Sequence, residues 1–459
     1  MSMPANPLRA IAEWSTGEAI ESLPAQAMAL VKRAVLDTIA VSLLGSRQHG
    51  PRIVAELQFA QQEPAHASVY GMRRKTGLLS AALINGTSAH VDLFDDNNVL
   101  MIAHPSASLL SALLPLAQVR GCSGREVIEA YAIGFEVGVK LGRMLNPELY
   151  EHGWHVTRVL GVMGATAACS RLLRLGSEQC AAALGVAASM ASGIRQNFGT
   201  MTMALHVGLT ARDAIHAALL AEAGFGADAE ALHGKYGFFP VFAQQNPEML
   251  PLGRPFELEA SGIMFKVFPS GAPTHAAVDA ALVLRDRLPG GVSGIECVTC
   301  FVHAWNAMTL REEQPKDPLQ AKVSLRYCVA AALLKGRLTP EEFAPQCIDE
   351  QALLDLAGRI DVQISGDLPD NGEFPAEVHV RTRDAQTHVQ RCEVPPGGSS
   401  RPVSYEQLVG KLRSCAAGIL EPSVVDRITQ AVARLEELRE VRGLCEMLEG
   451  PLSPALPRS

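Results

Sequence analysis

Apolar residues recur at helical spacing through most of the first 264 residues. The stretches 27–45 and 126–145 place apolar side chains three or four positions apart, which predicts amphipathic helices. Two further segments, 161–173 and 180–194, are rich in Ala and Gly, so we expect them to lie inside a tightly packed multi-helix core. No convincing strand pattern precedes residue 265. The first part of the chain is therefore predicted to be all-helical.

Short polar signals punctuate this helical part. Ser15 is followed three positions later by a Glu, and so is Ser123, which is the spacing of a capping box and predicts a helix start at each Ser. The segment 68–77 is polar and turn-rich and holds three consecutive basic residues at 73–75. We interpret this segment as a solvated loop.

The pattern changes at residue 265, where alternating and β-branched stretches begin. Thr339 followed by Pro340 predicts a helix start, and Ser404 opens a last helical stretch whose periodicity suits packing on the first part of the chain. We therefore predict an all-helical domain formed by residues 1–264 and 403–459, and an α+β lid domain formed by residues 265–402. The predicted strands are 293–303, 359–367, 375–384 and 388–394, and the predicted helices between or before them are 275–288, 317–335 and 340–357.

Composition and charge narrow the class of protein. The chain has 459 residues, of which 48% are hydrophobic, 19% charged and 5% aromatic, with a net charge of −8. This length predicts two domains with a large core, and the acidic balance disfavours nucleic-acid and anionic-membrane partners. No apolar run is long enough to predict a membrane span, and the N-terminal residues lack the apolar segment of a secretory signal, so we expect a cytoplasmic protein.

Ten cysteines are scattered along the chain, mostly among apolar residues. The one close pair is Cys297 and Cys300, which lies in a predicted strand. Positions three apart in a strand point to opposite faces, so these thiols would not converge on a metal ion. We expect reduced, mostly buried cysteines.

Candidate chemistry gathers in the stretch 82–113, where two apolar segments are joined by a polar loop. Unlike a short Gly- or Ser-rich connector, this join carries imidazoles and carboxylates, and loops held by rigid helices are where catalytic groups concentrate. His104 precedes Pro105, which places it at the mouth of a helix, where the pKa of a histidine is lowered. Taken by itself, His104 is more typical of a capping or packing residue. The polar residues of the loop are His90, Asp92, Asp95, Asp96 and His104.

Other candidates stand at similar breaks. Lys266 lies among apolar residues, where a lysine is either snorkelling to solvent or desolvated for catalysis. Arg195 begins a polar loop and could clamp a carboxylate, with a surface charge as the alternative. His155 and His206 stand at expected helix starts, and Tyr327 lies in an amphipathic helix, where a core tyrosine is the alternative. The phosphate-binding loop, dinucleotide, HExxH and GxSxG motifs are all missing from the sequence.

Together these segments resemble the MmgE/PrpD family over nearly the whole chain. The resemblance implies a large helical domain completed by both termini, a smaller α+β lid domain, a homodimer, and an active site in the cleft between the domains with no metal or organic cofactor. It also implies action on a small di- or tricarboxylic acid. The matching segments are NGTSAHVDLFDD (85–96) with HPSAS (104–108), GWHVTRVLGVMG (153–164), GTMTMALHVGLTARDA (199–214), FKVFPSGAPTH (265–275) and SLRYCVAAALL (324–334).

The resemblance assigns catalytic roles to four matching positions: His104 and His155 as acid/base groups, Lys266 as the cation on a carboxylate, and Tyr327 as proton donor or orienter. Three positions depart from the family pattern: this chain has Leu93 where the family has an aspartate, Asn97 where it has a threonine, and Met203 where it has a lysine. Loss of that lysine weakens binding of one substrate carboxylate or signals a less anionic substrate. The residues expected to bind substrate are Asp96, Asn97, Arg195, Met203, His206 and His275.

We therefore hypothesise a cofactor-independent lyase that moves a proton at the carbon α to a carboxylate and releases water or CO₂. Such a carbanion needs a positioned base and fixed positive charge. The first alternative is an epimerase or racemase that uses the same proton abstraction without a leaving group. The second alternative is a carboxylate-binding protein without catalytic activity on the same fold.

Overall fold

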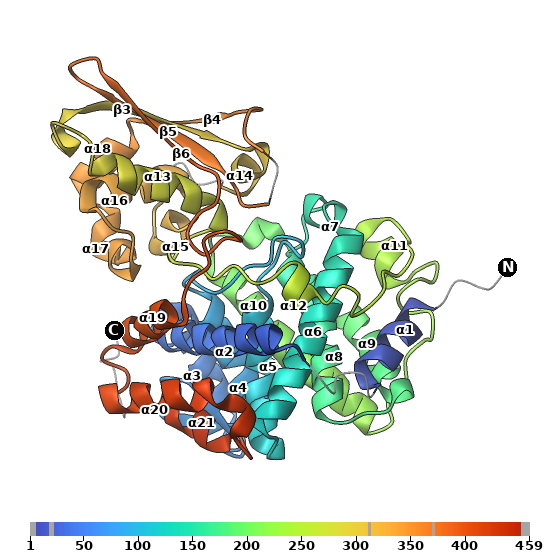
Figure 1. The fold of residues 1–459 in the computed structure, drawn as a ribbon. Helices are drawn as coiled ribbons and strands as arrows, with labels where there is room; N and C mark the ends of the chain where they lie inside the picture. The colour runs from blue at the N-terminus through green and yellow to red at the C-terminus, as the bar shows by residue number, and fades with distance from the viewer. Residues whose placement is uncertain (1–5, 18–22, 311–313, 370–371, 451–459) are drawn as a thin grey trace.

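The structure is a computed structural model that describes residues 6–17, 23–310, 314–369 and 372–450. It contains a large helical domain and a smaller domain built on one mixed sheet, which lies above the helical domain in Figure 1. One hydrophobic core combines residues from Leu8 to Phe265 with residues from Val403 to Leu448, and a second core draws on residues 276–392. Both ends of the described chain thus complete the large domain.

The large domain is organised around long helices of low polarity. In the C-terminal part of the chain, α19 packs against α2. Helix α20 contacts both α19 and α2, and α21 packs on α20 (Figure 1). The helices before the small domain are α1 (Pro7–Thr16), α2 (Ala25–Gly45), α3 (His49–Phe59), α4 (Leu78–His90), α5 (Pro105–Arg120), α6 (Gly124–Leu145), α7 (Glu148–Glu151), α8 (Val156–Leu172), α9 (Ser177–Met190), α10 (Met201–Glu222), α11 (Phe238–Ala243) and α12 (Glu257–Ala260). After it come α19 (Tyr405–Ala416), α20 (Pro422–Ala433) and α21 (Arg442–Met447).

Small residues let the central helices approach closely. A Cβ atom added at Gly134 on α6 would lie 2.7 Å from the carbonyl oxygen of Gly164 on α8, and one at Gly164 would lie 2.6 Å from the carbonyl oxygen of Gly134. Only glycine on both helices permits this backbone contact. The Ala- and Gly-rich sequence therefore determines how tightly α6 and α8 pack.

The small domain is a four-stranded sheet in the order β4-β3-β5-β6. Strands β3 and β4 are parallel, while β5 pairs antiparallel with both β3 and β6. Helices α13, α16 and α18 lie on one face of the sheet (Figure 1). The elements are α13 (His275–Arg285), β3 (Ile295–Val302), α14 (Ala304–Thr309), α15 (Pro318–Ala321), α16 (Leu325–Lys335), α17 (Pro345–Ile348), α18 (Gln351–Ala357), β4 (Ile360–Ile364), β5 (Ala376–Thr382) and β6 (Thr387–Cys392).

Two local predictions were wrong. The expected loop at 68–77 contains a short antiparallel hairpin, β1 (Ala67–Val69) and β2 (Arg74–Thr76), so the large domain is not purely helical. Within it, Lys75 bonds Glu446 of α21 at 2.8 Å instead of facing solvent freely. No helix begins at Ser15, because Ser15 lies in the last turn of α1; its expected capping partner Glu18 lies outside the described residues.

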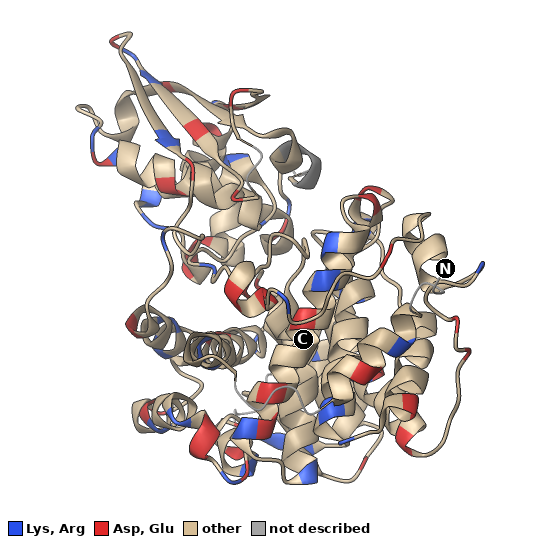
Figure 2. Ribbon diagram, turned by 45° about the vertical axis from the view of Figure 1, so that its right-hand side comes forward, with Lys and Arg blue, Asp and Glu red and all other residues tan. Residues whose placement is uncertain are grey.

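Charges of both signs are interspersed around the two domains (Figure 2), and no part of that view gathers one sign. Among the described helices, none combines the length and apolar character needed to cross a bilayer. All ten cysteines are described, all are free thiols, and only Cys297 and Cys347 are partly exposed. Within β3, Cys300 is buried while Cys297 is not, as expected for positions on opposite faces.

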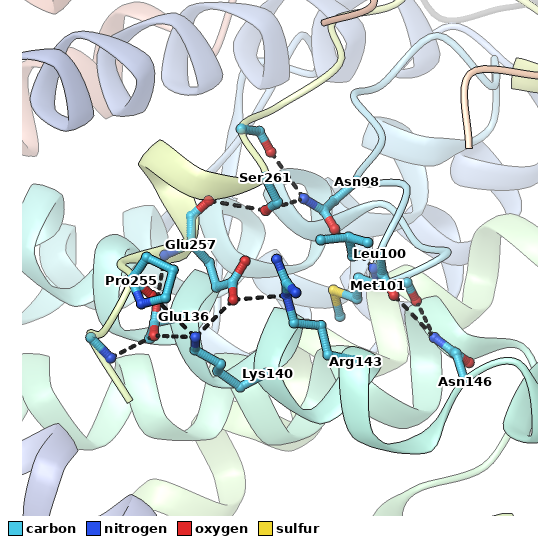
Figure 3. A network of polar contacts seen from close by, with 12 residues as sticks. Asn98, Leu100, Met101, Glu136, Lys140, Arg143, Asn146, Pro255, Glu257 and Ser261 are labelled. Atoms are coloured by element: carbon cyan, nitrogen blue, oxygen red, sulfur yellow. Dashed lines mark hydrogen bonds and ion pairs between the residues drawn. The ribbon is translucent and has the colours of Figure 1, made fainter. Parts of the chain in front are cut away.

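A buried ionic cluster anchors the segment that leads to the small domain (Figure 3). The carboxylate of Glu136 on α6 accepts the backbone N–H groups of Gly253 and Glu257, each at 2.6 Å. One turn along α6, Lys140 lies 2.8 Å from the Glu257 carboxylate, and Arg143 lies 2.9 Å from it. The fully buried Glu257 carboxylate is therefore paired with two cations, and these ion pairs fix α12 on the surface of α6.

The loop between α4 and α5 is tied to the same region (Figure 3). Asn98 donates to the Ser261 hydroxyl at 3.0 Å and to the Gly262 carbonyl at 2.9 Å, and its own carbonyl oxygen accepts the N–H of Met101 at 2.8 Å. Asn146, at the end of α6, donates to the Met101 carbonyl at 2.8 Å. The polar loop predicted to carry catalytic groups is thus held from two sides by rigid elements.

Candidate active site

A cavity of about 90 Å³ lies between the two domains and is lined by both. Of the ten predicted site residues, five line it: Asn97, His104, His155, Met203 and Lys266. His90 lines it as well. The structure thus brings together the three groups on which a shared catalytic centre depends, His104, His155 and Lys266. A larger hollow of about 940 Å³, between α9 and residues 225–242, contains none of the predicted site residues.

His104 is held in one tautomer by its neighbours. It is the N-cap of α5, where Pro105 begins the helix, and its backbone N–H donates to the Thr157 hydroxyl at 3.2 Å. Its Nδ1 lies 2.6 Å from the backbone carbonyl of Asp96, which can only accept, so Nδ1 carries the proton and Nε2 has a free lone pair. Burial lowers the pKa of His104 to about 3, and the ring is neutral at physiological pH.

A second histidine and a carboxylate support His104. His90, the last residue of α4, lies with Nδ1 2.8 Å from Oδ2 of Asp95, and the same oxygen lies 3.5 Å from Nδ1 of His104. The two rings are 4.7 Å apart. Burial would raise the pKa of Asp95, but the cationic forms of the two histidines and Lys266 outweigh it and lower the pKa well below its usual range. An ionised Asp95 therefore orients both rings.

His155 occupies the equivalent place on a different helix. It is the N-cap of α8, and its backbone N–H donates to the Gly193 carbonyl at 3.0 Å, which joins two loops. Its Nδ1 lies 2.9 Å from Nδ1 of His206 on α10, so one ring donates to the other. Burial, together with the positive charge that neighbouring His90 and His206 would carry, lowers the pKa of His155. His206 lies behind His155, outside the cavity lining, and its predicted contact with substrate is replaced by this contact with His155.

Lys266 lies in the segment that connects the two domains. Its side chain is 1% exposed, and Nζ donates to the carbonyl oxygen of Leu93 at 2.9 Å, where the backbone of Leu93 has φ +50°. Burial lowers the pKa of Lys266 to about 8, and the charge of Lys411 adds to this effect, whereas Asp95 opposes it. Among the described residues, Lys266 forms no ion pair, so its ammonium charge is available to an anionic ligand.

Lys411 of α19 fastens this connection from behind. Its Nζ donates to Oδ1 of Asp37 at 2.6 Å, to the Phe94 carbonyl at 2.7 Å and to the Lys266 carbonyl at 3.0 Å. The ammonium also lies 3.7 Å from the ring centre of Phe94. One side chain from the C-terminal part of the chain thus joins the catalytic loop to the Lys266 segment.

Four predicted residues point elsewhere. The Asp96 side chain is bonded to Ser106, and only its carbonyl serves the site. Tyr327 is buried in the core of the small domain, where its hydroxyl donates to the Glu342 carbonyl at 2.6 Å, so the structure does not place it with the other three catalytic candidates. Arg195 is buried; its guanidinium lies 3.5 Å from the ring centre of Tyr150 and donates to the Tyr150 carbonyl. His275 packs edge-on against Phe268.

An outer chamber of about 680 Å³ adjoins the cavity. The two share Val99, Ile102, Trp305 and Phe374, which therefore stand between the inner cavity and the outer chamber. These four residues come from the polar loop and from the small domain. A shift of the small domain against the large one would change this constriction.

Several lining residues were not predicted from sequence. His90 was visible in the polar loop, and its position at a helix end was the only signal that could have singled it out. Tyr150, Thr157 and Phe374 carry no local signal, because only the packing of separate elements brings them to the cavity.

The ligand atoms of His90, Asp95 and His104 lie within 4.8 Å of one another, a spacing at which side chains can hold a metal ion. A cation held by the Nδ1 atoms would replace the bond between His90 and Asp95 and the bond from His104 to the Asp96 carbonyl. The present contacts fit a hydrogen-bonded proton-transfer group without rearrangement.

Comparison with known proteins covers almost the whole chain. The model of the MmgE/PrpD N-terminal domain matches residues 9–250, and that of the C-terminal domain matches residues 268–437. The chain is 28% identical to cis-aconitate decarboxylase of Homo sapiens over 92% of this chain and 90% of that protein. It is 24% identical to cis-aconitate decarboxylase of Aspergillus terreus strain NIH 2624 / FGSC A1156 over 97% of this chain and 96% of that protein.

Proposed function

The chain belongs to the MmgE/PrpD family, and on that premise we propose that it is a lyase acting at the carbon α to a carboxylate of a small carboxylic acid. Relatives named cis-aconitate decarboxylase support a lyase as the class of enzyme. The observation that carries the proposal is the convergence, in one cavity, of a neutral imidazole of fixed tautomer and an otherwise unpaired ammonium, His104 and Lys266.

Positive charge at the cavity suits the anionic end of such a substrate. The Lys266 ammonium binds the carboxylate and stabilises the negative charge that develops on it as the carbanion forms. The N-termini of α5 and α8 add to this effect, because both helices begin directly after lining histidines. A carbanion formed beside this carboxylate is therefore stabilised without further groups.

Nε2 of His104 is the base. Its lone pair is free because Nδ1 donates to the Asp96 carbonyl, and the low pKa keeps the ring unprotonated. Abstraction of the α-proton transfers that proton to Nε2 and leaves the electron pair on the α-carbon. The imidazolium that forms is stabilised by the Asp95 carboxylate.

His155 serves the second half of the reaction. In the tautomer in which His206 donates to it, Nε2 of His155 carries a proton that can be given away. For loss of water, this proton goes to the departing hydroxyl while the C–O bond breaks. For loss of CO₂, no α-proton is removed: the C–C bond to the departing carboxylate breaks, its electron pair stays on the α-carbon, and the same proton goes to that carbon.

The proposal is tested by NMR of small carboxylic acids incubated with the enzyme in deuterated buffer. The acids are saturated, unsaturated and hydroxylated, with one to three carboxylates. Wild type is expected to place deuterium at the α-carbon of one acid with release of water or CO₂, and His104→Gln is expected to abolish the exchange. His216→Gln is the matched control, because His216 is exposed on α10. If none of these acids takes up deuterium at its α-carbon, the proposal is contradicted.

An epimerase is the second candidate. Two imidazoles from separate helices line the same cavity, so one can remove a proton and the other can return one from another direction. Deuterium incorporation with inversion, and without release of water or CO₂, would favour this function in the same experiment.

A further inference from the structure

The walls of the cavity differ in chemistry. Lys266 and the histidines occupy one part, whereas Leu93, Met203 and Val323 form a separate buried hydrophobic cluster that packs with Phe198. These four residues come from the polar loop, from α10 and its preceding loop, and from the segment before α16. Leu93, Met203 and Val323 belong to neither domain core, whereas Phe198 also packs against the core of the large domain, and all four line the cavity. The cluster is therefore an apolar wall of the site, formed where the domains meet.

The side that faces the outer chamber is also apolar. Val99, Ile102, Trp305 and Phe374 line it. The lining also holds the side chains of Asn97, Tyr150 and Thr157, which provide hydrogen-bonding groups but no positive charge.

Among the described residues that line this cavity, Lys266 is the one lysine or arginine. Burial lowers the pKa values of the lining histidines His104 and His155, which disfavours their cationic forms. The neighbouring lysines already pair with buried carboxylates: Lys322 with Asp92, and Lys411 with Asp37. A second carboxylate on the substrate would meet the apolar wall, where it would lose its hydration without gaining a counter-charge.

We infer that the substrate is a monocarboxylic acid with a short apolar arm, bound with its carboxylate at Lys266 and its arm against Leu93, Met203 and Val323. The cavity of about 90 Å³ is far smaller than the roughly 300–1,000 Å³ of sites for drug-sized ligands, so the arm has few carbon atoms. This inference rests on the proposed function for the reaction, but it concerns binding and is measured separately from turnover.

The test compares two acids of matched skeleton by titration calorimetry at pH 7. Tiglate is an unsaturated monoacid, and mesaconate is the diacid in which a carboxylate replaces the terminal methyl group of tiglate. We expect wild type to bind tiglate at least about tenfold more tightly than mesaconate. A Kd for tiglate equal to or above that for mesaconate overturns the inference. The deuterium-exchange experiment keeps its own outcome, so failure of one proposal is distinguishable from failure of the other.

Three variants sharpen the test. Met203→Lys adds a cation to the apolar wall and is expected to lower the mesaconate-to-tiglate Kd ratio about tenfold. Met203→Leu keeps the wall apolar and should preserve the ratio, as should Met201→Lys, because Met201 is 44% exposed two residues earlier on α10. A folded Met203→Lys protein, checked by circular dichroism, with the wild-type ratio would overturn the inference. If Met203→Lys does not fold, the mesaconate-to-tiglate Kd ratio of the wild type decides whether the inference stands.

Discussion

Replacement of Lys266 by Met gives the sharpest test of the site. The ammonium donates to one backbone carbonyl and forms no ion pair with any described carboxylate, so a bound carboxylate would be its charged partner. A hydrogen bond to a charged group contributes about 1.5–3 kcal/mol. On the substrate identified by deuterium exchange, Lys266→Met is therefore expected to lower kcat/KM by about ten- to 150-fold.

The pH dependence of kcat/KM distinguishes carboxylate binding by Lys266 from a purely structural role. Burial lowers the pKa of Lys266 to about 8, and the binding-competent form is the ammonium, so it is present below that pH and lost as the pH rises through it. Wild-type kcat/KM should fall about tenfold for each pH unit above 8. The low pKa of His104 predicts no loss of base between about pH 5 and 7.

A second group titrates in the same range. Burial, with the nearby Asp37 and Asp95 carboxylates, raises the pKa of Asp96 to about 8. Lys266→Met should therefore lose the alkaline decline in kcat/KM, whereas an Asp96→Asn variant should retain it. Lys322→Met is the control, because Lys322 is equally buried but outside the cavity lining. An unchanged alkaline decline in Lys266→Met would refute the assignment of the ammonium to the substrate.

Three further predictions concern the base, its orientation and the helix packing. His104→Gln should lower the rate of α-proton exchange by about 10²- to 10⁴-fold while leaving the thermal unfolding temperature close to wild type, as measured by NMR and calorimetry. Asp95→Asn should lower kcat/KM by about ten- to 150-fold, because His90 and His104 lose the charge that orients them; wild-type steady-state kinetics would count against this role. Gly134→Ala should reduce the free energy of unfolding by about 1–3 kcal/mol in a urea titration, because its Cβ would overlap the backbone of α8, whereas Gly443→Ala, which meets no atom within 4 Å, should cost nothing.

Much of the fold was predictable because its local signals are strong. The helix starts predicted at Ser123, Thr339 and Ser404 are confirmed, although Thr339 opens only a short 3-10 helix. The predicted strands after residue 292 match the four strands of the sheet to within a few residues. The β1–β2 hairpin was missed because each strand has three residues, too few to show an alternating pattern.

The site was predictable where its residues begin helices. His104 and His155 stand at N-caps, a position that sequence marks through the residues around it. Tyr327 shows the limit of this reasoning, because an apolar helix gives no sign of which face meets the cavity and which meets the domain core. Arg195 was given either a substrate role or a surface position, yet it stacks on Tyr150 inside the protein, a contact that only the tertiary fold creates.

The position of Lys411 has a consequence for synthesis of the protein. Its side chain holds together the loop of Phe94 and the segment of Lys266, but the ribosome makes α19 only after the entire small domain. A nascent chain with both sheet and helices already formed still lacks this clamp. The same C-terminal helices complete the hydrophobic core of the large domain, so a chain that ends before residue 411 would lack both the clamp and part of that core.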